Sequence, residues 1–357
     1  MNKLRPLVFA ALLVIPFAAT AADLKIAVVA PQSGNLEILG RQAIDGATLA
    51  ARDKAEIVLI DETCTDNSGP DIAEKIKQSG AAIAIGFLCS QSLEGGLPTL
   101  AAAKIPAITL SVRASILMED SLKKGWPLYR LAPSPTAERE KLADAIFQNW
   151  KGKPFAILDD GTITSRETAE TVRETLEQKG MKATLIDNFR PAQEMQTLLM
   201  RRLAKAGVTN VFASADRTDM SVMAHDAKAA GLNLTFLGGD ALNATDQGVP
   251  LEKGVLAVTE PDYQTLPSAK PVVDPLIKEG KAADGYVLPA YAAVTIALDA
   301  EEIAAGSGAT LAEALIDTPF QTVLGEIRFN KAHELATNPF ALLEWDGQGF
   351  KPVVTTQ

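Results

Sequence analysis

Apolar and polar positions alternate along this chain in two rhythms: short continuous apolar runs, and longer stretches with helical spacing. In the first third of the chain, apolar runs and intervening helical stretches occur at 24–29, 39–52, 56–60, 72–78, 81–87 and 105–110. Continuous apolar runs are typical of parallel strands that are covered on both faces. Their regular alternation with helices predicts a doubly wound α/β sheet.

The same rhythm restarts after a proline-rich joint at residues 133–136. Thr136 is placed to cap a helix over 137–150, because Ser and Thr side chains accept hydrogen bonds from free N–H groups at helix starts. Further strands and helices are predicted at 155–158, 166–179, 183–186, 195–206, 208–213, 219–230, 234–237, 287–305 and 311–316. The pattern therefore predicts an α/β protein with two lobes.

The first 22 residues have the features of an export signal. Two basic residues precede an apolar stretch at 7–19, and the small residues Ala19-Thr20-Ala21 follow, as a signal peptidase requires. The stretch is shorter than the roughly 20 residues that a membrane span needs. We expect cleavage near Ala21 or Ala22, and no lipid anchor because no Cys follows. The alternative is a buried first helix.

Composition excludes several classes of function. The 357 residues carry 34 Lys and Arg against 44 Asp and Glu, a net charge of −10, which becomes −12 without the two basic residues of the signal. Basic runs never exceed two residues and aromatic residues make up 5%, so nucleic acid is not an expected partner. Two histidines and two cysteines cannot form a His- or Cys-rich metal centre.

Cys64 and Cys89 lie 25 positions apart, each just after a predicted strand. In an exported protein such a pair is most simply one disulfide, and the alternative is two unrelated buried thiols. Closing a loop of this length stabilises a protein by about 3–4 kcal/mol in the chain-entropy model.

The sequence has no recognisable catalytic equipment. Glycine-rich phosphate-binding motifs and a GxSxG elbow are absent, and Ser121-Leu122-Lys123-Lys124 matches SxxK without the motifs that accompany it in enzymes. His225 and His333 stand alone, and the Asp159-Asp160 pair is typical of an ordinary loop at a strand end. We therefore expect neither an enzyme nor a bound cofactor.

Several segments resemble one known family in their order along the chain. These are LKIAVVAPQSG at 24–34, IDETCTDN at 60–67, IGFLCSQS at 85–92, AKAAGLNLTFLGGDAL at 227–242 and YVLPAYAA at 286–293. They are similar to the type I periplasmic binding proteins of ABC transporters, and specifically to the leucine/isoleucine/valine-binding proteins. The spacing of the two cysteines resembles that of the disulfide-bearing segments in this family.

The resemblance implies two doubly wound parallel-sheet lobes joined by a three-strand hinge, with a ligand clamped in the cleft between them. The implied first lobe is 23–133 plus 262–325, the second is 134–261 plus 326–357, and the chain crosses near 130–135, 258–262 and 324–338. The proline-rich joint coincides with the first crossing. A hinge of this kind lets a ligand that bridges both lobes favour the closed state.

On the first lobe, the resemblance assigns Ser90, Ser111 and Arg113 to the ligand. A serine at the position of Ser90 binds the ligand carboxylate in the family, at a helix N-terminus that suits an anion; the alternative is a simple N-cap. The glycines at 95–96 and Pro98 are expected to disrupt this helix. Arg113 stands where the family has a threonine, and its cation suits carboxylate binding; the alternative is a rim arginine paired with a local acid.

On the second lobe, Asp240 falls at the family's acidic position, which pairs with the ligand ammonium. Asp216 and Thr164 stand where family members often have tyrosines. Tyr286 falls at an aromatic position that lines the side-chain pocket. Together these residues suit a small zwitterion, without choosing among polar amino acids, amides and similar polar solutes.

The resemblance thus implies a monomeric periplasmic receptor that delivers a small amino-acid-like solute to an inner-membrane ABC permease. An exported ligand-sensing subunit on the same fold is the main alternative, and it would bind a membrane kinase rather than a permease. An exported α/β enzyme is a third possibility, which no catalytic motif supports.

Overall fold

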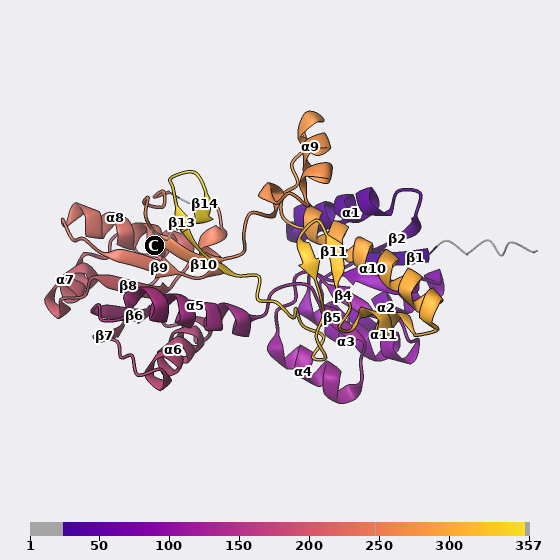
Figure 1. Ribbon diagram of the computed structural model, residues 1–357, viewed down its shortest axis with the longest axis horizontal. Coiled ribbons are helices and arrows are strands. Elements are labelled where there is room, and N and C mark those ends of the chain that lie inside the picture. The colour runs from indigo at the N-terminus through magenta and orange to yellow at the C-terminus, as the bar shows by residue number, and fades with distance from the viewer. Residues whose placement is uncertain (1–23, 247, 354–357) are drawn as a thin grey trace, which may run out of the picture.

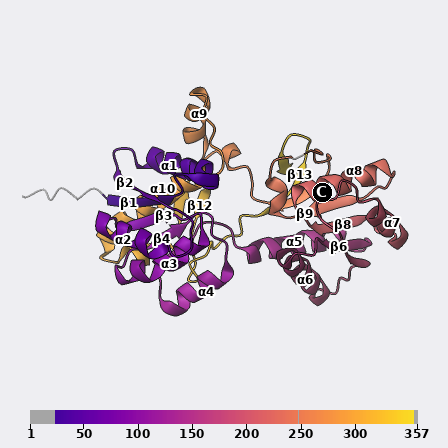
Figure 2. The ribbon, with the colours of Figure 1, turned by 180° about the vertical axis from the view of Figure 1, so that it is seen from behind.

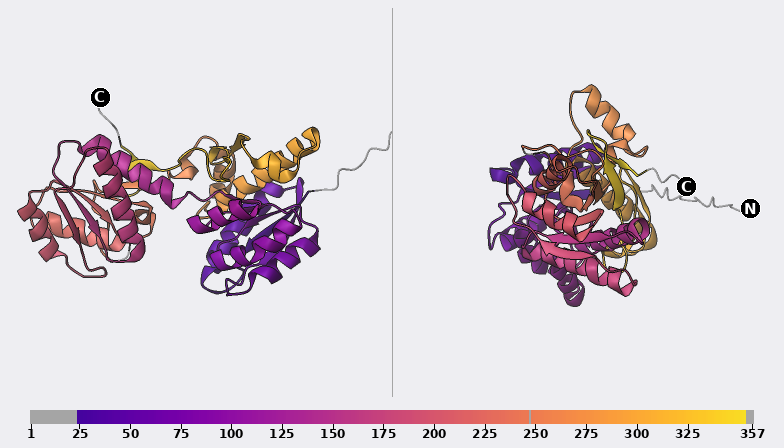
Figure 3. Two further views of the ribbon diagram at one scale, coloured as in Figure 1. Left: turned by 90° about the horizontal axis from the view of Figure 1, so that it is seen from below. Right: turned by 90° about the vertical axis from the view of Figure 1, so that its left-hand side faces the viewer.

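The computed structural model describes residues 24–246 and 248–353, so the predicted signal peptide at 1–22 lies outside the described residues. Figure 1 shows two α/β lobes arranged along the long axis, with three segments of chain running between them. The view from below in Figure 3 shows the same separation into two sheets with their own helices. The predicted architecture of two doubly wound lobes is confirmed.

The first lobe is built on five parallel strands in the order β2-β1-β3-β4-β5. Residues of β1 alternate between the two faces, with Ile26 and Val28 in one core and Ala27 and Val29 in the other. The strands are β1 (Leu24–Ala30), β2 (Ala55–Asp61), β3 (Ile83–Gly86), β4 (Ala107–Thr109) and β5 (Leu128–Arg130). Burial on both faces explains why the sequence reads as continuous apolar runs rather than as alternation.

Helices cover both faces of this sheet. On one face α1 packs against α10, and on the other α2 packs against α3. Figure 2 shows α9 at the outer edge of the lobe. The helices are η1 (Gly34–Leu36), α1 (Glu37–Ala51), α2 (Gly69–Ser79), α3 (Ser90–Ala102), α4 (Ser115–Lys124), η3 (Tyr263–Thr265), α9 (Lys270–Lys278), α10 (Val287–Ser307) and α11 (Leu311–Leu315). A hairpin of β11 (Phe320–Thr322) and β12 (Gly325–Ile327) completes the lobe.

The second lobe contains a seven-stranded sheet in the order β14-β13-β10-β9-β8-β6-β7. Five of its strands are parallel and repeat the strand order of the first sheet, whereas β13 and β14 add an antiparallel edge that the sequence did not predict. The strands are β6 (Phe155–Asp159), β7 (Leu185–Asn188), β8 (Asn210–Ser214), β9 (Thr235–Gly238), β10 (Leu256–Thr259), β13 (Ala341–Trp345) and β14 (Phe350–Pro352). The helices are α5 (Pro135–Trp150), α6 (Ile163–Gln178), α7 (Thr197–Ala206), α8 (Arg217–Ala229) and η2 (Asp240–Asn243).

The chain passes between the lobes three times. The first passage lies between β5 and α5, and the second lies between β10 and η3, where Tyr263 packs against the first-lobe core. The third lies at the end of the predicted crossing at 324–338, after the expected lobe boundary at 325/326. Phe329 is buried in the first-lobe core and Leu335 packs against it, whereas Phe340 is buried in the second-lobe core. Residues 326–335 therefore pack with the first lobe, although the expected boundary assigned them to the second.

Two local predictions were wrong. The N-cap of α5 is Ser134, whose side chain accepts a hydrogen bond from the backbone N–H of Ala137, and Pro135 takes the first helical position in place of the expected Thr136 cap. The helix α3 runs unbroken through 95–96 and Pro98. A Cβ on Gly69 of α2 would lie 2.6 Å from the backbone of Gly95, so the glycines allow two helices to approach closely rather than ending one of them.

Among residues 24–246 and 248–353, the structure contains no helix with the length and apolar character needed to cross a bilayer.

Candidate functional site

The loops at the carboxyl ends of both parallel sheets carry most of the predicted ligand residues. Ser90 follows β3 and Arg113 follows β4 in the first lobe, while Asp216 follows β8 and Asp240 follows β9 in the second. In sheets with this strand order, ligands bind beyond the carboxyl ends of the strands, where the order reverses. The two loop sets are joined by direct contacts of Arg113, described below.

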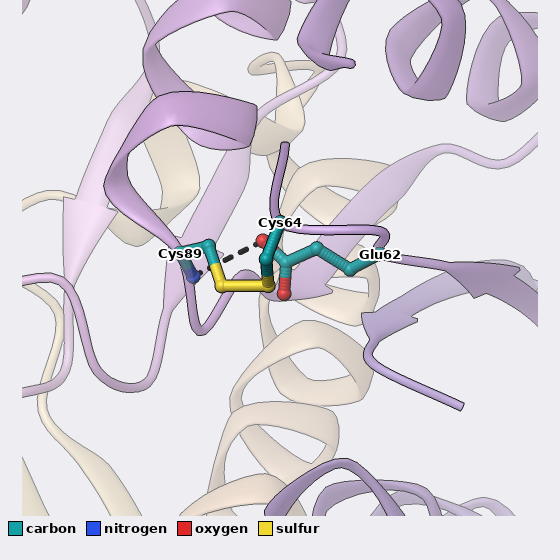
Figure 4. Close-up of side chains that lie close together, drawn as sticks. All are labelled: Glu62, Cys64 and Cys89. Carbon is teal, nitrogen blue, oxygen red and sulfur yellow. Dashed lines mark hydrogen bonds between the residues drawn. A yellow bond between two sulfur atoms is a disulfide. The ribbon is translucent and has the colours of Figure 1, made fainter. Parts of the chain in front are cut away.

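The disulfide predicted between Cys64 and Cys89 is confirmed. The two Cα atoms lie 5.5 Å apart, and the bond ties the loop after β2 to the start of α3 (Figure 4). Glu62 lies beside both sulfur atoms, but metal binding by cysteine requires thiolates, and here both sulfurs are oxidised. This group is therefore a structural junction and not a metal centre.

Glu62 is a residue that the sequence analysis missed. Its carboxylate is buried and accepts hydrogen bonds from the backbone N–H groups of Leu88 (2.7 Å) and Cys89 (3.1 Å), and from the Ser92 hydroxyl (2.6 Å). Burial raises the pKa of Glu62, and these three donors partly oppose the rise. Glu62 therefore fixes the loop that presents Ser90. Glu62 lies two residues before Cys64, and this proximity to a predicted disulfide is the sequence signal that could have revealed it.

Ser90 is the first residue of α3 and is exposed. The helix N-cap is Cys89, which makes no side-chain hydrogen bond to the helix, so the alternative of Ser90 as a simple N-cap does not hold. The N–H groups of Leu88 and Cys89 are already bonded to Glu62, which leaves the N–H groups of the first turn, beginning at Ser90, for an anion. The binding role of Ser90 stays a prediction.

Arg113 reaches across from the first lobe to two acids of the second. Its Nη1 lies 3.1 Å from Oδ2 of Asp240, and its Nη2 lies 3.0 Å from Oε2 of Glu138, in the first turn of α5. The guanidinium also lies over the ring of Phe340, 5.6 Å from the ring centroid. Arg113 is thus paired with acids, as one sequence alternative held, but those acids belong to the opposite lobe.

Asp240 lies at the centre of this group. Its Oδ1 accepts hydrogen bonds from the hydroxyl of Thr259 (2.7 Å) and from the backbone N–H of Glu260 (3.4 Å), while Oδ2 accepts from Arg113. The backbone N–H of Asp240 in turn donates to Oε1 of Glu138 (2.8 Å). Asp240 is thereby held in place by the N-terminal turn of α5 and the C-terminal end of β10. These two ends adjoin the first and second passages between the lobes.

A third acid, Glu260, is joined to Asp240 through its backbone N–H. The hydroxyl of Tyr263 donates to Oε1 of Glu260 at 2.7 Å. Burial raises the pKa of Glu260 to about 7, and the nearby charge of Asp240 adds to the rise. Burial also raises the pKa of Glu138, against the opposing effect of Arg113. We call Arg113, Glu138, Asp240, Glu260 and Tyr263 the inter-lobe cluster.

The remaining predicted residues lie outside the inter-lobe cluster. Asp216 caps α8 by accepting a hydrogen bond from the N–H of Asp219 (2.7 Å). Thr164 is exposed in the first turn of α6, and Ser111 is half-buried after β4. Tyr286 precedes α10 and packs against the first-lobe core. No hydrogen bond or ion pair among the described residues joins any of these four to Arg113, so their role in binding stays a prediction.

Comparison with known proteins places the chain in a family. The family model described as periplasmic binding protein matches residues 23–350. The chain belongs to the periplasmic binding protein family. The curated relatives that it matches include Leu/Ile/Val-binding proteins, in agreement with the resemblance found in the sequence.

Two relatives in this family cover nearly the whole chain. The leucine-, isoleucine-, valine-, threonine- and alanine-binding protein of Pseudomonas aeruginosa is 26% identical over 356 residues, which cover 94% of each chain. The Leu/Ile/Val-binding protein of Escherichia coli (strain K12) is 26% identical over 354 residues, which cover 93% of each. Among solved structures, an ABC transporter substrate-binding protein from Desulfitobacterium hafniense shares the fold, with a TM-score of 0.72 and 18% identity over 92% of this chain and 99% of that one.

Proposed function

We propose that the mature chain captures a small amino-acid-like solute between its two lobes and presents it to an inner-membrane ABC permease. The observation that carries this proposal is the family match over residues 23–350, together with relatives that bind amino acids and cover more than 90% of the chain. The proposal includes export to the periplasm, removal of residues 1–22 without a lipid anchor, action as a monomer, and no catalytic activity.

The arrangement of the passages supports capture by closure. We propose the three passages as a hinge, with lobe boundaries near 131–134, 260–262 and 336–339. Each of the four hydrophobic core clusters lies within one lobe. Rotation about the short joining segments therefore leaves these clusters intact. A ligand that contacts both lobes then stabilises the closed state by its additional contacts.

We assign the ligand's polar groups to the loops at the carboxyl ends. The first turn of α3 at Ser90 and the side chain of Arg113 would take the carboxylate, and Asp240 would take the ammonium. Ser111, Thr164, Asp216 and Tyr286 would line the rest of the cleft. This division places an anion site on one lobe and a cation site on the other, so that a zwitterion bridges both.

The test is ligand-dependent thermal stabilisation of the full mature chain. A ligand that binds the native state alone raises apparent stability by RT ln(1 + [L]/Kd), about 2.7 kcal/mol at a hundredfold excess over Kd. We expect at least one of the twenty amino acids to raise the melting temperature in a concentration-dependent way. The variant Arg173→Gln, on the outer part of α6, is the control and should respond like wild type.

A screen of amino acids, amides, carboxylates and polyamines in which nothing stabilises the chain would contradict the proposed ligand class. Co-purification of a membrane kinase in place of a permease would favour the sensor alternative.

A further inference from the structure

The Arg113 guanidinium occupies the position that a cationic ligand group would be expected to take. It is held between two carboxylates of the opposite lobe, Asp240 and Glu138, with one Nη atom directed to each. Its side chain is 32% exposed, so solvent and ligands can reach it. The predicted cation site is therefore filled by a cation from the other lobe.

Both carboxylates that face Arg113 already have hydrogen-bond donors. Each oxygen of Asp240 and of Glu138 accepts a hydrogen bond, from Arg113 on one side and from the second lobe itself on the other. Across the described ranges, no other Lys or Arg forms an ion pair with either carboxylate. An incoming ammonium that seeks Asp240 must therefore displace Arg113 or share its acceptor with it.

Displacement of Arg113 from the two acids, without a new partner for its guanidinium, is unfavourable. A guanidinium that leaves both acids loses two charge-assisted hydrogen bonds, and its Nε atom is buried and has no hydrogen-bond partner even before displacement. A simple amine would replace one cation by another and leave Arg113 unpaired. A simple carboxylate would draw Arg113 away and leave the acids unpaired. A molecule that carries both groups leaves neither side without a counter-charge, because its ammonium takes the place of the guanidinium between Asp240 and Glu138 and its carboxylate faces Arg113.

We propose that Arg113 is a specificity-determining residue: a tethered cation that a zwitterionic ligand displaces from Asp240 and Glu138 and then binds through its own carboxylate. This inference rests on the proposed function. The two ion pairs of Arg113 between the lobes are exchanged for contacts through the ligand, from its ammonium to Asp240 and Glu138 and from its carboxylate to Arg113. Arg113 thus excludes molecules that carry only one of the two charges.

The test uses matched sets of probes on the full mature chain. The sets are leucine with isoamylamine and isocaproate, alanine with ethylamine and propionate, and asparagine with β-alaninamide and succinamate. In each set the second probe lacks the carboxylate and the third lacks the ammonium. Affinities are measured by calorimetry for wild type, Arg113→Gln, Arg113→Lys and the control Arg173→Gln. Arg173 also bridges two carboxylates, Glu170 and Glu177, but within one helix.

For wild type, we expect the best-bound amino acid to exceed its amine and its acid by about 100-fold, as two charge-assisted contacts require. In Arg113→Gln the amine should bind about tenfold more tightly than to wild type, because its competitor is gone, while the amino acid binds about tenfold more weakly. Arg113→Lys should recover part of the selectivity, and Arg173→Gln should leave it unchanged. Circular dichroism of each variant checks that it is folded, so that parallel weakening of the probes in a folded variant counts against the exchange.

The outcomes separate this inference from the proposed function. If an amino acid binds wild type but its amine binds within about threefold of it, or if Arg113→Gln weakens amine and amino acid in parallel, the exchange is wrong and amino-acid capture stands. If no amino acid binds wild type, amino-acid capture and the exchange both fail.

Discussion

Two arginine–carboxylate bridges lie beside the passages between the lobes, and they differ in burial and in what they join. Arg130 on β5 is 1% exposed and is paired with Glu334, which precedes the third passage. Both partners pack within the first lobe, where the backbone N–H of Arg130 also donates to the carbonyl of His333. Arg113 is 32% exposed and joins the first lobe to the second.

The difference separates a fixed bridge from an exchangeable one. Removing one partner of a buried ion pair leaves an uncompensated charge and costs several kcal/mol, whereas exposed pairs contribute about 0–1 kcal/mol. The Arg130 bridge thereby anchors residues 326–335 to the first lobe, beside the His333 ring, which stacks on Tyr129 at 4.4 Å. The Arg113 bridge is part-exposed and opens at a smaller cost than the Arg130 bridge, as the proposed ligand exchange requires.

The largest effect is expected for Glu334→Gln. This change leaves the buried Arg130 guanidinium without an anion, and it should lower the free energy of unfolding by about 3 kcal/mol. Urea unfolding followed by tryptophan fluorescence and circular dichroism measures the loss, with Arg113→Gln as the matched comparison. If Glu334→Gln cost less than Arg113→Gln, burial would not be what distinguishes the two bridges.

The second prediction concerns pH and the inter-lobe cluster. The folded protein holds the Glu260 proton more tightly than the unfolded chain, because burial raises its pKa to about 7 from an ordinary value of about 4.5. This contribution to stability is fully present below about pH 4.5 and is lost as pH rises through about 7, with a size on the order of 3 kcal/mol.

Glu260→Gln should remove that pH dependence, so the difference between variant and wild type is measured at several pH values. Asp219, whose pKa burial raises to about 6, changes stability in the same direction in both proteins and cancels in the difference. Tyr263, Asp240 and Arg113 face Glu260 and are unchanged in the variant. A difference that stays constant from pH 4 to pH 8 would contradict the prediction.

The third prediction tests whether a buried anion can be fixed without an arginine. Glu62 is held by two backbone N–H groups and one hydroxyl. Glu62→Gln keeps one acceptor but turns an amide N–H toward backbone donors, so it should cost about 1–2 kcal/mol. Denaturant unfolding gives the value, and Glu74→Gln on the exposed face of α2 is the control. A neutral Glu62→Gln would mean that the loop before Ser90 is held by the disulfide alone.

The smallest effect is expected for Arg113→Gln on stability. The part-exposed bridge should contribute about 1 kcal/mol or less to the free energy of unfolding, and added salt should diminish the difference because screening weakens charge pairs that solvent reaches. Unfolding at low salt and in 1 M NaCl provides the measurement. A loss above about 2 kcal/mol that salt does not reduce would make Arg113 a structural residue like Arg130.

The sequence predicted what depends on local pattern. Buried runs such as 24–29 identified the parallel strands, and two cysteines in a chain predicted to be exported indicated their disulfide. It missed the three-residue strands β5, β11, β12 and β14, which are too short to give a period. Glu138 and Glu260 escaped notice because nothing local distinguishes a glutamate in a first helical turn or after a strand. Their meaning comes from Arg113, which is distant in sequence and meets them only in the folded chain.

The contact between α1 and α10 has a consequence for the order in which the chain assembles. These helices pack on one face of the first sheet, yet α1 ends at Ala51 and α10 begins at Val287. During synthesis, the parallel strands of the second sheet, β6 to β10, are complete before α10 exists. The apolar face of the lobe whose strands are made first therefore waits for a helix translated more than two hundred residues later.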